Sequence, residues 1–142
     1  MNQAQRSGGN FRSIGAILAG LVAVVVLSLV TDVALHALGV FPPWGQPVGN
    51  APLLLATVYR TVFGVLGSNI TARLAPDRPM GHALAGGLIG LVLSTVGAVA
   101  TWNQGPGFGA HWYPLALIAL AMPTAWAGGK LRALQLRRQP AF

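Results

Sequence analysis

Residues 79–129 read PMGHALAGGLIGLVLSTVGAVATWNQGPGFGAHWYPLALIALAMPTAWAGG, a run of 51 residues that contains no Asp, Glu, Lys or Arg. A helix needs about 20 apolar residues to cross the hydrocarbon core of a bilayer, so this run is long enough for two crossings. The segment 103–112, NQGPGFGAHW, interrupts it with proline and glycine, which break helices. The run therefore predicts two membrane spans joined by a turn.

The composition of the whole chain indicates the same class. Of its 142 residues, 54% are hydrophobic and 8% are charged, against roughly 25% charged residues in an ordinary soluble domain. So few charges cannot cover the surface of a soluble domain, and a disordered segment would be more polar. Two further uncharged runs, 13–31 and 33–59, suit two more spans. We predict an all-α fold, an integral membrane four-helix bundle with up-down-up-down order.

The predicted organisation is a single membrane domain over residues 1–142. Its spans are expected at about 14–40, 51–74, 80–101 and 112–129, with outer loops 41–50 and 102–111, an inner loop 75–79 and a basic tail 130–142. The last span can continue as an amphipathic turn through Leu136, and Pro123 predicts a kink in it. A cleaved signal peptide is the alternative for the first span, but its uncharged stretch exceeds the usual apolar region of about 7–15 residues.

The positive charges set the expected orientation. The net charge is +7, and eight of the nine Lys and Arg residues lie in the two tails or where the second and third spans connect (Arg73 and Arg78), with none in the outer loops. Positive loops stay in the cytoplasm, so we predict cytoplasmic N and C termini in a bacterial-type inner (plasma) membrane. The bilayer is the first predicted partner, and nucleic acid is not expected, because no single basic patch forms. Lipid headgroup contacts are predicted for Arg73, Arg78, Lys130, Arg132, Arg137 and Arg138.

Asp32 and Arg60 are the two charged residues inside predicted spans. A lone charge there costs about 2.5–3.5 kcal/mol. Asp32 lies eight residues before Val40, and Arg60 lies nine residues after Ala51. At about 1.5 Å per helical residue both charges reach nearly the same depth on neighbouring antiparallel spans. The counts predict an ion pair between them, because pairing compensates both charges.

Three neighbours extend this pair into a candidate intramembrane polar site. His36 and Ser28 lie four residues after and before Asp32, on the same helical face, and Tyr59 precedes Arg60. Ionisable groups inside membranes often mark substrate, ion or proton sites. The structural alternative is that the ion pair only fixes the register of the first two spans and that His36 is an interfacial histidine.

Small residues recur every four positions on two spans. We predict that they serve helix packing, because small side chains let backbones approach closely in lipid. The predicted packing residues are Gly86, Gly90 and Ser94 on the third span and Gly64 and Ser68 on the second. Packing within one bundle and packing between subunits both remain open.

The chain has few of the residue types that carry out catalysis or bind metals. The chain has no Cys and no Glu, so common nucleophile, acid–base and thiolate metal sets are missing. His36, His82 and His111 are expected at different depths, so no metal site is predicted, and no cofactor is predicted. The two outer loops contain similar sequences, Trp44-Gly45-Gln46 and Trp102-Asn103-Gln104. Duplication of a helical hairpin is therefore an open hypothesis.

These observations favour a structural or accessory subunit that packs within a larger membrane assembly or oligomer. The expected protein partner is a second copy of the chain or another membrane protein, because so small a bundle has a limited interior. The alternative is a small oligomeric transporter or channel that uses Asp32, Arg60 and His36. An intramembrane enzyme is the third and least favoured hypothesis.

Overall fold

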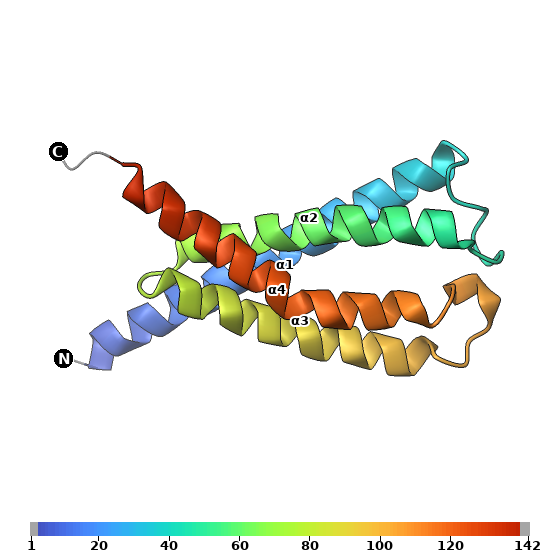
Figure 1. Cartoon of the computed structure of the whole chain (residues 1–142). Helices are drawn as coiled ribbons and strands as arrows, with labels where there is room; N and C mark the ends of the chain where they lie inside the picture. Colours follow the sequence, from blue (N-terminus) through green and yellow to red (C-terminus); the bar gives the residue numbers. More distant parts are fainter. Residues whose placement is uncertain (1–2, 140–142) are drawn as a thin grey trace.

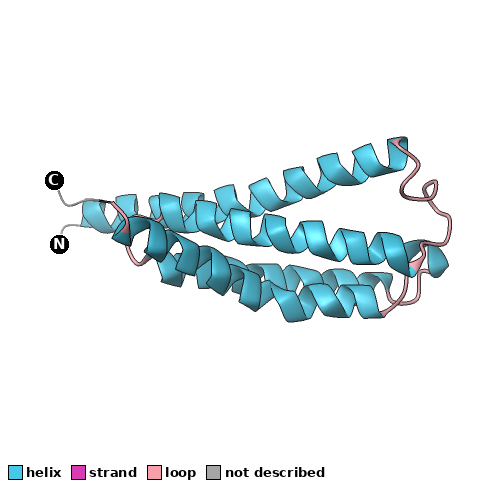
Figure 2. Ribbon diagram, turned by 45° about the horizontal axis from the view of Figure 1, so that its top comes forward, coloured by secondary structure: helices cyan, strands magenta, loops and turns pink. Residues whose placement is uncertain are grey.

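The computed structural model describes residues 3–139, and the side chains of residues 7–139. The described part is all-helical: α1 spans Gln3–Ala37, α2 Asn50–Leu74, α3 Pro79–Thr101 and α4 Trp112–Arg137, with a short 3-10 turn, η1, at Pro106–Phe108. The helices run side by side in alternating directions (Figures 1 and 2). The predicted all-α bundle with up-down-up-down order is confirmed. Residues 140–142 of the predicted basic tail lie outside the described residues.

Both described chain ends and the tight turn 75–78 lie at one end of the bundle, which we call the termini end (Figure 1). The longer connections, 38–49 and 102–111, lie at the opposite end, which we call the loop end. The helices spread apart toward the loop end (Figures 1 and 2). The predicted basic clusters are therefore at the termini end, because they flank the chain ends and the tight turn.

Helix boundaries follow local chemistry. α1 ends at Ala37 rather than at the expected residue 40, because Gly39 adopts a left-handed conformation with φ +71°. The backbone N–H groups of Val40 and Phe41 then both donate to the carbonyl of Leu35 (2.9 and 3.2 Å), which closes the helix end. α1 also starts well before the expected residue 14, at Gln3.

Within the described residues, three helices are long and apolar enough to cross a membrane: α1 (from Ser7), α2 and α3. They mark the chain as a membrane protein. The expected fourth span, α4, is as long as these but less uniformly apolar, because prolines and a glycine pair interrupt it and its last turns are basic. Its helix continues without a break to Arg137, past the expected end at residue 129. α4 bends near its middle, where Pro123 lies inside the helix (Figure 1).

The core is built from small side chains. Six of the eight buried hydrophobic residues described are alanines: Ala16, Ala56, Ala72, Ala83, Ala98 and Ala125. Glycines let the backbones touch. A Cβ added to Gly128 of α4 would lie 2.5 Å from the Val65 carbonyl oxygen and 2.5 Å from the Ser68 Cβ. The bundle therefore coheres by close backbone approach, which replaces the hydrophobic driving force that lipid removes.

This packing predicts that Gly128→Ala destabilises the bundle. The added methyl group meets backbone atoms of α2, and overpacking of this kind costs about 1–3 kcal/mol. The matched control is Gly97→Ala on α3, where an added Cβ meets no heavy atom within 4 Å. That change should be neutral or stabilise by up to about 1 kcal/mol. Thermal unfolding in mild detergent measures both, and equal melting temperatures for the two variants would contradict the packing argument.

Candidate functional site

An ion pair joins α1 to α2 inside the bundle. Arg60 Nη2 lies 2.6 Å from Asp32 Oδ2, and the Tyr59 hydroxyl donates a hydrogen bond to Asp32 Oδ1. Both carboxylate oxygens of Asp32 therefore have a partner. The side chains are 14% (Asp32) and 31% (Arg60) exposed. The structure thus brings together three of the predicted site residues.

The pair forms because the two helices are antiparallel neighbours with a connection of only twelve residues, 38–49. Asp32 lies five residues before the end of α1, and Arg60 lies ten residues after the start of α2. Their helical depths differ by a few residues, and the long arginine side chain spans this difference. Pairing at this depth removes the cost that each charge would carry alone.

Arg60 has more hydrogen-bonding capacity than Asp32 uses. Its guanidinium carbon lies 5.9 Å from the centre of the Tyr113 ring on α4, a favourable cation–π position. Its Nε atom is buried and has no hydrogen-bond partner among the described residues. A buried N–H without a partner is costly, so the ion pair leaves one donor of Arg60 unused. Tyr113 is missing from the predicted site, because the sequence does not show which residue of α4 faces Arg60.

His36 belongs to the loop end rather than to the ion pair. Its Nδ1 donates to the backbone carbonyl of Asp32 (2.7 Å), and its ring stacks on Trp44 at 3.6 Å and meets Phe41 edge-on at 5.2 Å. In the other outer loop the ring of His111 stacks similarly on Trp102, at 4.1 Å. The imidazole of His36 is thus held by aromatic stacking beside Asp32.

Two cavities meet at the ion pair. The inner cavity, about 340 Å³, lies between the four helices toward the middle of the bundle. The outer cavity, about 150 Å³, lies under the connection 38–49 and is lined by His36, Trp44, Tyr59 and Tyr113 among others. Asp32 and Arg60 line both cavities. The ion pair therefore lies where the two cavities adjoin.

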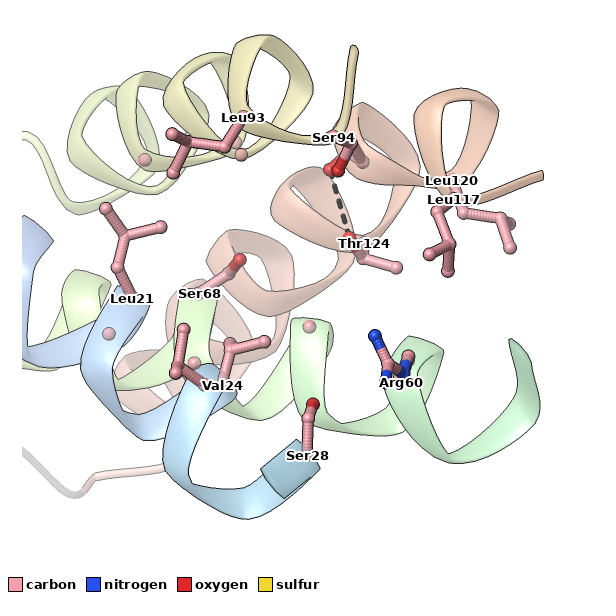
Figure 3. A pocket seen from close by; sticks show the side chains of 18 of the residues that line it. Leu21, Val24, Ser28, Arg60, Ser68, Leu93, Ser94, Leu117, Leu120 and Thr124 are labelled. Carbon is pink, nitrogen blue, oxygen red and sulfur yellow. Dashed lines mark hydrogen bonds between the residues drawn. The ribbon is translucent and has the colours of Figure 1, made fainter. Parts of the chain in front are cut away.

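Three serines are among the few polar residues of the inner cavity. Ser28 of α1 is buried, and Ser28, Ser68 and Ser94 all line the cavity. Figure 3 shows Ser28, Ser68 and Arg60 directed toward the space between the helices. The three serine hydroxyls have no hydrogen-bond partner within the described side chains, 7–139. The cavity is thus apolar over most of its lining with a few unused polar groups, as in small-molecule sites.

The predicted packing residues divide into two groups. Gly64 faces Thr124 of α4, where an added Cβ would lie 3.1 Å from the threonine Oγ1, and Ser68 faces Gly128. Gly86 is buried near Ile17 of α1. These three lie at helix contacts, and all three also line the inner cavity.

Gly90 and Ser94 have space beside them in the bundle, and their role in helix packing stays a prediction. A Cβ added to Gly90 meets no heavy atom within 4 Å, and both residues line the inner cavity. The four-residue spacing places both residues on the face of α3 that lines the inner cavity, but the neighbouring helices leave space at this level. Close contacts missed from the sequence are those of Gly20 with Gly67 and of Gly87 with Ala125. Only the large number of glycines in the sequence indicated that such contacts would form.

The predicted headgroup residues lie at or near the termini end. Arg73 Nε donates to Asn69 Oδ1 (2.9 Å), and Lys130 Nζ lies 6.0 Å from the centre of the Trp126 ring. Arg132 Nε is buried without a partner among the described residues. The remaining three predicted headgroup residues are exposed: Arg78, Arg137 and Arg138. Their place suits a polar interface, and the headgroup contact itself stays a prediction.

Comparison of the chain with protein-family models, curated proteins and solved structures finds no match. Within the described residues no three His, Asp or Glu side chains gather closely enough to hold a metal ion. Asp32, Arg60, Tyr59 and the serine hydroxyls can pair charges and form hydrogen bonds at this site.

The ion pair predicts strong coupling between its two members. Asp32→Asn or Arg60→Gln alone leaves one charge without its partner, and each should lower the unfolding free energy by about 3–5 kcal/mol. The double variant removes both charges and should be more stable than the sum of the single effects implies. Tyr59→Phe loses one hydrogen bond to a charged group, so it should lower the unfolding free energy by a smaller amount, about 1–3 kcal/mol.

The measurement is a double-mutant cycle of thermal or denaturant unfolding in one detergent. Additive effects of the two single changes would show that the charges do not stabilise each other.

Proposed function

We propose that this chain is a small membrane transporter or channel in which Asp32, Arg60 and Tyr59 form a gate. The observation that supports the proposal is that Asp32 and Arg60 line both cavities. In this proposal a solute that passes from the outer cavity into the inner cavity displaces this ion pair.

The inner cavity is also closed toward the termini end. There a Cβ added to Gly67 of α2 would lie 2.7 Å from the carbonyl oxygen of Gly20 on α1, so the two helices touch through their backbones. The cavity thus lies between a backbone contact on one side and a charge pair on the other. A central site with a closure on each side is the arrangement that alternating access requires.

The two closures differ in how they open. Separating Gly20 from Gly67 requires two helices to move, whereas opening the ion pair requires only side-chain rotation. A solute that competes for Arg60, or a proton that neutralises Asp32, lowers the cost of that rotation. We therefore assign the gate to the loop end and the slower conformational change to the termini end.

The orientation belongs to the proposal. The basic clusters at the termini end favour a cytoplasmic position for both chain ends, since positively charged loops stay inside. The loop end then faces outward from a bacterial-type inner membrane. The aromatic residues Phe41, Trp44, Trp102 and Trp112 at the loop end suit the level of the lipid headgroups.

A structural or accessory subunit is the second proposal. The observation that favours it is that α1 packs on α2 and less on α3, and hardly meets α4. One side of α1 is therefore free to pack against another copy of the chain or a different membrane protein. In this role the ion pair would serve to hold α1 in register.

The gate predicts a change in accessibility. The chain has no native cysteine, so Ser94→Cys in the inner cavity and Gln46→Cys beside the outer cavity give single reporters. In nanodiscs the bilayer covers the sides of the bundle, and a charged thiosulfonate reagent can enter only from water. Position 46 should react rapidly and position 94 slowly. Adding Asp32→Asn with Arg60→Gln should accelerate the reaction at position 94 about tenfold or more, because the ion pair is gone.

The matched control is Val99→Cys on the exposed face of α3, whose rate should not change in the gate variant. A rate at position 94 that is equal with and without the ion pair would sink the gate. Release of protons, potassium and chloride from proteoliposomes then measures transport itself, and permeability equal to that of empty liposomes for all three ions argues against an ion channel.

The subunit proposal predicts a distinct outcome on purification. Extraction in mild detergent followed by intact-mass measurement should show a stoichiometric second membrane protein if the chain is accessory. The transporter proposal expects only copies of this chain. A preparation that contains the chain alone and retains the gated accessibility excludes the obligate accessory role.

A further inference from the structure

We propose that the inner cavity binds an uncharged amphiphile, a molecule with a hydroxyl or carbonyl head group and an apolar chain, which enters from the bilayer between α1 and α3. The inference rests on the proposed function and deepens it, because it names the substrate class of the same site. Four features of the cavity carry it: its mouth, its lining, its hydrogen-bond donors and its charge.

The mouth of the cavity faces sideways. Val25 and Leu29 of α1 and Leu93 of α3 line the cavity and are 55%, 58% and 60% exposed. These residues lie in the middle parts of helices that are long and apolar enough to cross a membrane. Exposed apolar side chains at that level face lipid chains rather than water. A molecule that enters by this mouth must first dissolve in the bilayer.

The lining suits an apolar chain. Leu21 and Val24 of α1 and Leu117 and Leu120 of α4 surround the cavity, and its polar groups are few (Figure 3). The volume of about 340 Å³ lies at the lower end of the range, about 300–1,000 Å³, that is typical of small-molecule sites. A single apolar chain fits this volume better than a two-chain lipid, whose second chain would remain in the bilayer.

The polar residues of the cavity offer hydrogen-bond donors. Both oxygens of Asp32 already accept hydrogen bonds, from Tyr59 and Arg60. Arg60, whose guanidinium group has more donors than Asp32 uses, and the hydroxyl of Ser28 belong to the cavity lining. A head group that carries an oxygen acceptor finds donors of both kinds there, whereas a purely apolar molecule would leave them without a partner.

The charge balance excludes an ionised head group. Asp32 and Arg60 compensate each other at 2.6 Å, so the site has no net charge. A carboxylate or ammonium head would add a charge without a counter-charge in a medium of low dielectric constant, and this costs several kcal/mol. A hydroxyl or carbonyl head forms its hydrogen bond without breaking the ion pair.

Photolabelling tests this inference directly. The probe is dodecanol with a diazirine at the end of its chain, added to the full chain in nanodiscs and cross-linked by light. Mass spectrometry should find the label on residues 21–29 and 90–94, which border the mouth. Unlabelled dodecanol should compete about tenfold more strongly, or better, than dodecyltrimethylammonium, or than dodecanoate at an alkaline pH that keeps it ionised.

Gly90→Leu is the blocking variant, since its side chain enters the cavity from a position where an added Cβ meets nothing within 4 Å. It should lower labelling about tenfold, the equivalent of about 1.4 kcal/mol. Gly97→Leu is the matched control, because Gly97 is equally open but does not line the cavity. Ser94→Leu blocks the cavity from the next turn of α3 and serves as a second variant.

Labelling that persists in both blocked variants, or equal competition by the charged amphiphiles, would overturn the inference. The assay measures occupancy and needs no flux, so it separates this inference from the proposed function. If the cavity is labelled but the ion-pair variant does not change the reaction rate at position 94, the binding site is supported and the gate is contradicted. If the reaction rate changes but the cavity is not labelled, the gate is supported and the amphiphile is contradicted.

Discussion

The arrangement of this protein depends on one constraint: two opposite charges lie inside helices that are otherwise built for lipid. Asp32 and Arg60 resolve it by pairing at 2.6 Å, with Tyr59 donating to the second carboxylate oxygen. This pairing requires α1 and α2 to lie side by side in a single register. The same residues line both the outer cavity at the loop end and the inner cavity toward the middle of the bundle. The ion pair that holds α1 against α2 is thus also the candidate gate.

The small residues determine where space is left. Toward the termini end, Gly20, Gly67, Gly87 and Gly128 bring backbones into contact, and the core is mostly alanine. Toward the loop end the helices spread (Figure 1), and Gly90 lies beside open space. A glycine can therefore serve close contact in one turn of a helix and a cavity in the next. The difference depends on what the neighbouring helix presents at that level.

The inner cavity combines an apolar mouth with a partly polar interior. Val25, Leu29 and Leu93 at its mouth are apolar and exposed, whereas serines and Arg60 also belong to its lining. Lipid chains offer no hydrogen-bond partner to polar groups. Such groups therefore occur where a ligand or an enclosed water molecule can form hydrogen bonds with them. This combination connects the gate to the proposed amphiphile, because both use the unequal hydrogen bonding of Asp32 and Arg60.

The sequence alone determined the number and order of the helices, because uncharged runs about 20 residues or longer have few alternatives to membrane spans. It also placed Asp32 and Arg60 at similar depth, since helical rise converts residue counts into distance. Only the tertiary structure decided that Gly90 and Ser94 line a cavity, that Tyr113 stacks near Arg60, and that His36 turns to Trp44. These outcomes depend on side-chain directions and on the spreading of the helices, to which residues distant in sequence contribute. A four-residue period identifies the face of a helix, but not what that face meets.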